Sequence, residues 1–187
     1  MSQSLQGKRV AILGTDGFEE AELSSPRAAL QKEGVEVDVV SPKKQGIRAW
    51  AKTDWGDVYQ VDKALDDAQP SDYHALVLPG GLFNPDTLRL DEKALAFARG
   101  FFEQGKPVAA ICHAPWILIN AGLVEGRRMT SVSSVSQDLR NAGANWVDES
   151  VVVDNGLVTS RTPKDLEDFN AKLIESLEQG AEMEKHA

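Results

Sequence analysis

The sequence predicts an α/β fold in which a mainly parallel sheet is covered by helices on both faces. Short apolar runs, which are typical of strands, alternate along the chain with segments whose apolar residues recur at helical spacing. Several of the strand-like runs are apolar throughout, as is typical of parallel strands buried on both faces. The chain has 187 residues and no internal repeat, which is close to the size of one domain. We therefore expect a single domain over 1–187, with its core at about 8–177 and flexible ends at 1–7 and 180–187.

In the first half of the chain, the expected strands are separated by one helix and one excursion. Residues 9–14 and 36–40 have strand patterns, and 18–33 carries apolar residues at helical spacing. Pro26 within that helical segment indicates either a kink or a later start of the helix. From 43 to 61, single apolar residues alternate with polar ones. We therefore expect a small β-hairpin there rather than another crossover.

In the second half, two central strands are followed by shorter elements. Residues 75–78 and 107–111 are continuous apolar runs, and 91–104 between them has helical spacing. The remaining expected elements are a helix at 114–121, a short helix at 135–141, a hairpin of 151–153 and 157–160 around Asn155-Gly156, and a terminal helix at 165–177. The alternation of strands and helices favours crossover connections and thus a parallel sheet.

Composition and charge exclude several classes of protein. The chain has 20 basic and 29 acidic side chains and a formal net charge of −9, which argues against a nonspecific nucleic-acid binder and against a helix on anionic lipid. A single cysteine excludes an intrachain disulfide. No apolar run approaches the roughly 18 residues of a membrane span, and residues 1–7 lack the apolar core of a signal peptide. We expect a cytoplasmic protein with no nucleic-acid or membrane partner.

Cys112 is the candidate nucleophile because it follows the strand 107–111 and precedes a helix. In parallel sheets, chemistry collects beyond the carboxyl ends of the strands. A sharp strand-to-helix turn presents a strained nucleophile, and Ala110 and Ala114 are the small neighbours that such a turn needs. The helix dipole there would lower the thiol pKa. His113 would act as general base or as an imidazolium beside the thiolate.

More ordinary roles exist for both residues. A lone cysteine is often a small buried apolar residue, and a histidine often donates to a backbone carbonyl. A metal site made of Cys112 and His113 would need the distant His74 or His186, and no known ligand spacing joins them. The residues therefore argue against a metal site.

Five segments of the chain match the pattern of a known family. The first, 105–116, ends in Ile111-Cys112-His113-Ala114-Pro115-Trp116, and the others are 17–23, 76–81, 142–148 and 158–163. Together they resemble the DJ/PfpI branch of the class I glutamine-amidotransferase-like superfamily. This branch contains PfpI-type intracellular peptidases, the parkinsonism-associated deglycase, bacterial glyoxalases and general stress proteins. The resemblance runs from about residue 8 to residue 177 and implies a flavodoxin-like three-layer sandwich. It also implies that the protein uses neither a metal nor an organic cofactor.

The resemblance also implies roles for individual residues. Glu22 takes the place of the acid that approaches the nucleophile, and a protonated carboxyl buried there could donate a hydrogen bond to a thiolate. The backbone N–H groups of Gly81 and His113 take the places of the oxyanion hole. Asp86 stands near the position at which PfpI-type peptidases place an acid from a neighbouring subunit to orient the histidine.

Two departures weaken the peptidase interpretation. The glycine turn before Asp86 is one residue longer than in the peptidases, and the acid is shorter. The peptidases also have a tyrosine shortly after the Thr-Ser pair, whereas Val132 follows Ser131 here. The segment 79–86, which we expect to be a loop, and Trp116 are closer to the bacterial stress-protein subgroup. Trp50 and Trp55 in the excursion form either a dimer contact or ordinary scattered exposed residues.

Three functions remain open. The first is a cysteine-dependent stress-response enzyme, of glyoxalase or deglycase type, that acts on methylglyoxal, glyoxal or their early protein adducts. The second is an intracellular cysteine peptidase that acts on peptides through Cys112, His113 and Asp86, with the acid supplied by a neighbouring subunit. The third is a redox sensor or chaperone without enzymatic activity, which responds through oxidation of Cys112. We expect a homodimer or a higher homo-oligomer.

Overall fold

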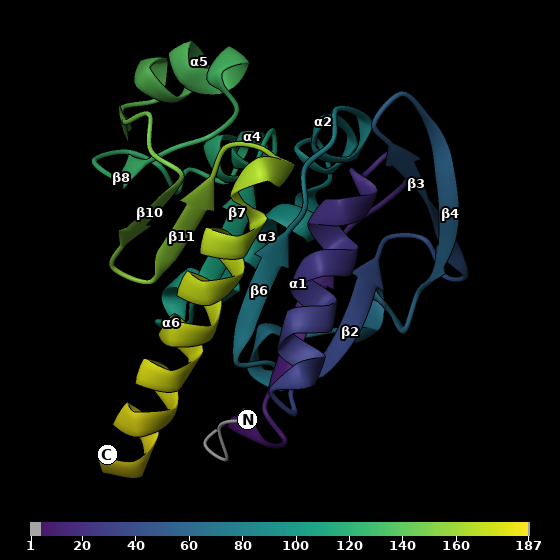
Figure 1. Ribbon diagram of the computed structural model, residues 1–187, viewed down its shortest axis with the longest axis vertical. Helices are drawn as coiled ribbons and strands as arrows, with labels where there is room; N and C mark the ends of the chain where they lie inside the picture. The colour runs from purple at the N-terminus through teal and green to yellow at the C-terminus, as the bar shows by residue number, and fades with distance from the viewer. Residues whose placement is uncertain (1–4, 187) are drawn as a thin grey trace.

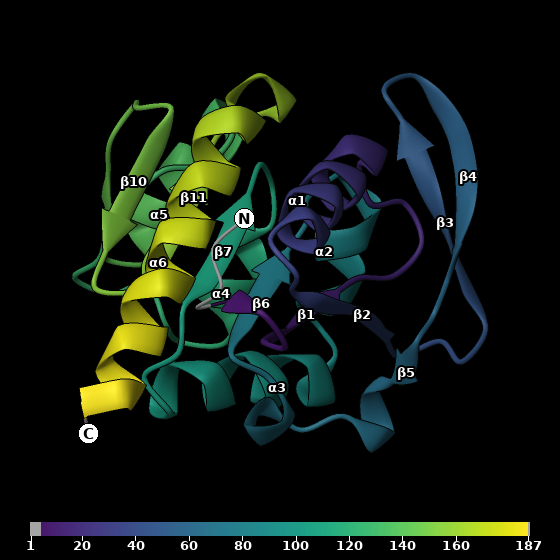
Figure 2. The same cartoon turned by 60° about the horizontal axis from the view of Figure 1, so that its bottom comes forward.

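The computed structural model describes residues 5–186, which form a seven-stranded sheet between two layers of helices (Figures 1 and 2). In spatial order the strands are β10 (Val151–Asp154), β11 (Leu157–Ser160), β7 (Val108–Ile111), β6 (Ala75–Leu78), β1 (Arg9–Leu13), β2 (Glu36–Ser41) and β5 (Lys63–Ala64). All neighbouring pairs are parallel except β10 and β11, which form an antiparallel hairpin. The prediction of a mainly parallel, flavodoxin-like three-layer sandwich is confirmed.

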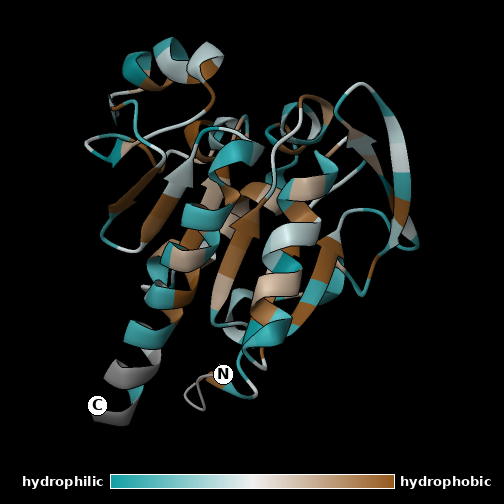
Figure 3. Ribbon diagram, viewed as in Figure 1, coloured by the Kyte–Doolittle hydropathy of each residue, from teal (hydrophilic) through white to brown (hydrophobic). Residues whose placement is uncertain are grey.

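The two helical layers bury opposite faces of the central strands. The helices are α1 (Glu20–Lys32), α2 (Phe83–Leu88), α3 (Glu92–Glu103), α4 (Pro115–Asn120), α5 (Ser136–Asn141) and α6 (Leu166–His186). One face packs on α1 and α6, as Leu23 and Phe169 show, and the other packs on α2 to α5, as Phe101 and Leu118 show. The strands between the layers are largely apolar (Figure 3). This burial on both faces explains the continuous apolar runs in the sequence.

The excursion is a hairpin of β3 (Gly46–Ala51) and β4 (Asp54–Gln60), as predicted. It projects beside α1 and lies outside the main sheet (Figure 1). A bridge between Glu19 and Trp50 and an edge-to-face contact between Phe18 and Tyr59 attach it to the start of α1. A further small pair, β8 (Arg128–Met129) and β9 (Asn145–Trp146), lies near α5.

Four details differ from the sequence-based expectations or resolve them. The segment 79–86, expected to be a loop, contains the start of α2, and α1 continues through Pro26 from Glu20. The flexible end expected at 180–187 is instead helical as far as His186, and Lys8 pairs with Glu184 at 2.6 Å. Of the flexible start expected at 1–7, residues 1–4 lie outside the described residues, as does residue 187. Leu5 is fully buried, so apolar packing anchors the chain before β1.

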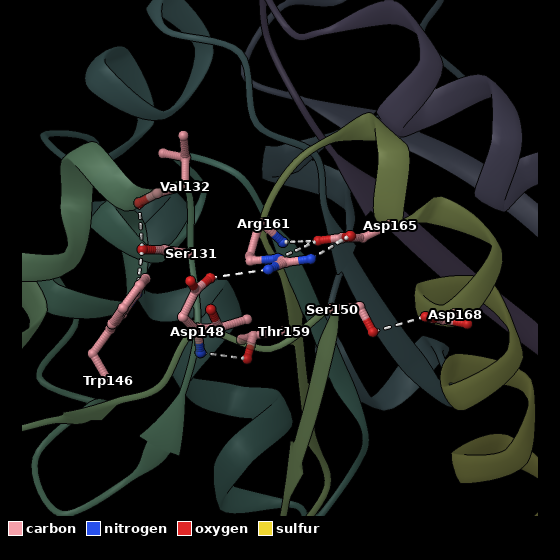
Figure 4. A network of polar contacts seen from close by, with 10 residues as sticks. Ser131, Val132, Trp146, Asp148, Ser150, Thr159, Arg161, Asp165 and Asp168 are labelled. Carbon is pink, nitrogen blue, oxygen red and sulfur yellow. Dashed lines mark hydrogen bonds and ion pairs between the residues drawn. The ribbon is translucent and has the colours of Figure 1, made fainter.

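A polar network fixes the carboxyl end of β11 (Figure 4). The side chain and the backbone N–H of Arg161, the residue after β11, donate to Asp165, and Arg161 Nη1 donates to Asp148 at 2.9 Å. Burial acts to raise the pKa of Asp165, but the hydrogen bonds from Arg161 outweigh it and hold the pKa below its ordinary value. The strand end is therefore held firmly beside β7, where the candidate nucleophile lies.

Within residues 5–186, no helix is both long enough and apolar enough to cross a bilayer.

Candidate active site

Cys112 lies directly after β7 in the left-handed region of backbone space, with φ at 65°. A residue with a Cβ is strained in this conformation by about 1–2 kcal/mol, so the surrounding structure must hold it there. The Cys112 N–H donates to the carbonyl of Ser160 at 3.1 Å, and its own carbonyl accepts from Val132 N–H at 3.0 Å. The strand-to-helix turn expected from the sequence is thus a strained elbow held by two neighbouring segments.

His113 faces the thiol. Its Nδ1 lies 3.2 Å from Cys112 Sγ, which is hydrogen-bonding distance for a thiol. Burial lowers the pKa of His113, so the imidazole is neutral at neutral pH. With the proton on Nε2, Nδ1 is free to accept the thiol proton. This geometry suits a general base.

Glu22 is fully buried in the first turn of α1. Its Oε1 accepts the N–H of Gly80 at 2.8 Å, and Oε2 makes no hydrogen bond of good geometry to the described residues. Burial raises the pKa of Glu22 to about 8, although the Gly80 N–H and the nearby thiol of Cys112 act in the opposite direction. The carboxyl is therefore mostly protonated at neutral pH and carries a proton that it can donate.

Two glycines let these groups approach one another. A Cβ on Gly80 would lie 2.7 Å from both Cys112 Cβ and Glu22 Oε1, so any larger residue would push the acid and the thiol apart. Gly81 has a φ of 80°, and a Cβ there would lie 2.4 Å from the carbonyl oxygen of Gly17. The N–H groups of Gly81 and His113 both donate toward the Cys112 sulfur. The two amides assigned to an oxyanion hole by resemblance therefore converge on the nucleophile.

The expected lowering of the thiol pKa is wrong for this structure. Burial, followed by the charge of Glu22, raises the pKa of Cys112, and the two backbone N–H groups only partly oppose this. The dipole argument fails because α4 has only 6 residues and begins at Pro115, beyond the thiol. The resting residue is consequently a thiol that needs a base.

Asp86 is not brought into this group within one chain. It is exposed on α2, and its carboxylate has no hydrogen bond or ion pair within residues 5–186. The structure therefore brings together Cys112, His113, Glu22 and Gly81 and leaves Asp86 outside. Contact between Asp86 and the histidine of a second subunit stays a prediction.

Asn84 is a site residue that the sequence did not reveal. It is fully buried on α2, where its Oδ1 accepts the N–H of Thr15 at 2.7 Å. Its Nδ2 donates to the carbonyls of Pro79 and Gly80, at 2.9 and 3.2 Å. Asn84 thus fixes the glycine turn that separates the thiol from the acid. An asparagine before a proline is an ordinary turn signal, so nothing in the sequence marked this one as buried.

Beside the start of α1 lies an aromatic surface formed by Trp50, Trp55 and Phe83. The rings of Trp55 and Phe83 stack with centroids 6.0 Å apart, and Trp50 meets both edge to face. Phe83 packs so closely on the backbone that a Cβ on Gly17 would lie 2.5 Å from it.

Among the described residues, no group of three or more His, Cys, Asp or Glu side chains is placed to hold a metal ion.

Comparison with known proteins gives a consistent result. The sequence profile of the DJ-1/PfpI family matches residues 8–176. The chain is 43% identical over 171 residues to "Protein/nucleic acid deglycase 2" of Escherichia coli, covering 91% of this chain and 98% of the relative. It is 44% identical over 170 residues to "Putative cysteine protease YraA" of Bacillus subtilis, with the same coverage. The crystal structure of Drosophila melanogaster DJ-1beta superposes with a TM-score of 0.84 at 27% identity and covers 95% of each chain.

Proposed function

The chain belongs to the DJ-1/PfpI family, and from this premise we propose that it is a cysteine-dependent enzyme that converts methylglyoxal, glyoxal or their early adducts on proteins into hydroxy acids. The observation that carries the proposal is the buried, protonated Glu22 next to Cys112 and His113. Acyl transfer by a cysteine needs one base, whereas moving hydrogen between adjacent carbons needs a second proton carrier. Relatives named as deglycases support the same choice.

The first step is addition of the thiol to the aldehyde carbon. Cys112 Sγ forms a bond to C1 of methylglyoxal while His113 Nδ1, 3.2 Å away, takes the thiol proton. The developing oxyanion is stabilised by the N–H groups of Gly81 and His113. His113 then returns the proton to that oxygen, and the product is a neutral hemithioacetal.

The second step moves hydrogen from C1 to C2. His113 takes the proton from C1, and Glu22 donates its proton to the ketone oxygen, which gives an enediol. The proton on the C1 oxygen then returns to Glu22, and His113 protonates C2. C1 is thereby oxidised and C2 reduced, which leaves a lactoyl thioester on Cys112. Water hydrolyses this thioester to lactate and restores the thiol.

The test is lactate formation from methylglyoxal, followed by NMR. We expect the wild-type protein to form lactate and Cys112→Ser to form none above the buffer background. Glu22→Gln should be slower by roughly 10²–10⁴-fold, the usual contribution of a positioned acid or base. Glu103→Gln, on an exposed position of α3, is the matched control and should match the wild type. A wild-type protein that forms no lactate overturns the proposal.

A second candidate, peptide hydrolysis, is favoured by one observation. Asp86 is exposed and unpartnered within residues 5–186, so it is free to orient His113 of another subunit. One relative also carries a protease name. Cleavage of a fluorogenic peptide that is lost in both Cys112→Ser and Asp86→Asn would support this function. Cleavage unchanged by Asp86→Asn would contradict the peptidase arrangement.

A further inference from the structure

Trp116 contacts the imidazole of His113. It follows His113 by three positions at the start of α4, a spacing that places two side chains on the same face of a helical turn. The two ring centroids lie 5.0 Å apart at an interplanar angle of 62°. The backbone N–H of Trp116 also donates to the backbone carbonyl of His113 at 3.0 Å. The indole of Trp116 therefore contacts the imidazole of His113, and the two residues are also joined through their backbones.

Trp116 is itself held from two other elements. Its Nε1–H donates to Asp138 Oδ2 on α5 at 3.0 Å. The guanidinium of Arg89, the residue that follows α2, lies 5.0 Å from the centre of the indole. This distance is within the range of a cation–π contact. Arg89 Nε in turn donates to Asn120 Oδ1 at the end of α4. The indole is therefore fixed by α2, α4 and α5 together.

Among the described residues, no side chain other than Cys112 is hydrogen-bonded to the His113 ring. Within residues 5–186, the hydrogen-bonding contact of its ring is the one with Cys112 Sγ, and Asp86 does not reach it. A base that activates a thiol is normally oriented by a third group. The aromatic group in contact with the His113 ring is the Trp116 indole.

We propose that Trp116 is a positioning residue, which holds the His113 imidazole with Nδ1 toward Cys112 and is itself held by Asp138 and Arg89. This inference rests on the proposed role of His113 as the base for the thiol. It gives the chain an internal means of orienting that base, independent of a carboxylate from another subunit.

The test is a double-mutant cycle on the rate at which iodoacetamide alkylates Cys112 at pH 7. We expect His113→Gln and Trp116→Leu each to slow alkylation by about tenfold, a modest part of what a positioned base supplies. The double variant should be no slower than either single one, because Trp116 acts through His113. Trp116→Phe, which keeps a ring against the imidazole, should retain most of the rate. Val153→Ala, which shortens an exposed side chain on the edge strand β10, is the control and should alkylate at the wild-type rate.

Two results would overturn the proposal. One is a Trp116→Leu protein that alkylates as fast as the wild type. The other is a double variant that alkylates about tenfold more slowly than His113→Gln alone. The indole would then act independently of the base. Should Trp116→Leu fail to fold by circular dichroism, the exposed Asp138→Ala replaces it in the same cycle, with a smaller expected loss. Alkylation needs no dicarbonyl, so absence of lactate and absence of coupling between Trp116 and His113 are separate outcomes.

Discussion

At the residue scale, three titratable side chains are packed together and all are uncharged at rest. Burial raises the pKa of Glu22 and of Cys112 and lowers that of His113, which leaves a carboxylic acid, a thiol and a neutral imidazole at neutral pH. This arrangement avoids the large cost of burying an isolated charge. In the proposed reaction, negative charge develops only when the thiol adds to the substrate. The backbone N–H groups of Gly81 and His113 already point toward the sulfur at which this addition takes place.

The raised pKa of Glu22 predicts a pH-dependent stability. A buried acid whose pKa rises from 4.5 to about 8 stabilises the fold below pH 4.5, and this contribution is lost as pH rises through about 8. Glu22→Gln removes that dependence. The stability of the wild type relative to Glu22→Gln should therefore fall with increasing pH, by at most about 1.4 kcal/mol per unit. Urea unfolding of both proteins at several pH values between 5 and 8 measures the difference.

Comparing the two proteins cancels the contributions of His74 and His113, whose lowered pKa values give the opposite slope. Parallel stability profiles would show that Glu22 is charged in the folded protein and contradict its role as a proton donor.

Sheet topology and the family resemblance predicted that Glu22 meets Cys112 and keeps its proton, but they did not predict the raised pKa of the thiol. Glu22, Gly81, Cys112 and His113 lie at strand ends and in a first helical turn, and topology alone brings such positions to one edge of the sheet. The thiol pKa depends instead on how deeply the surrounding structure buries the thiol. That burial is a tertiary property, which cannot be predicted from the local geometry of one helix.

At the element scale, α2 is the part of the site that sequence patterns did not predict. It has 6 residues and contains Pro85, so it has neither the length nor the periodicity of a recognisable helix. Its formation depends on tertiary contacts, with Leu88 buried in the core and Asn84 bound to two turns. By contrast, α3 and α6 carry long apolar faces and were predicted to within a few residues at their starts.

Asn84→Ala tests how strongly α2 supports the site. The substitution leaves the N–H of Thr15 and the carbonyls of Pro79 and Gly80 without their buried partner. We expect a loss of about 2–4 kcal/mol in the free energy of unfolding and slower alkylation of Cys112. Urea denaturation and iodoacetamide kinetics measure the two effects. Thr87→Ala, at an exposed position of the same helix, is the control, and an equal loss there would show that the effect does not come from the buried hydrogen bonds of Asn84, because alanine is the best helix former.

At the scale of the whole molecule, exposed apolar side chains lie on β4 and at the start of α2, where Trp55 and Phe83 stack on each other. They are Trp55, Val58, Leu82 and Phe83, with exposed fractions of 41, 67, 53 and 50%. Apolar residues grouped in this way commonly mark an interface. The expected homo-oligomer stays a prediction, and this is the surface on which it can be tested.

Sedimentation velocity at micromolar concentration provides that test. We expect the wild type to sediment as a dimer or larger species and Phe83→Ser to shift toward the monomer, because half of the ring is exposed and its removal costs little in the isolated chain. Val153→Ser, on the far edge strand β10, should sediment like the wild type. A wild-type monomer would instead leave the aromatic surface available to substrate.

The contact between Lys8 and Glu184 has a practical consequence. It brings the beginning of β1 and the last turn of α6 together (Figure 1), at the amino edge of the sheet, whereas Cys112 follows β7 at the carboxyl edge. A surface linker attached at Lys8 or at Glu184 would therefore lie on the side away from the thiol. Protein immobilised in this way would present its reactive edge to the solution.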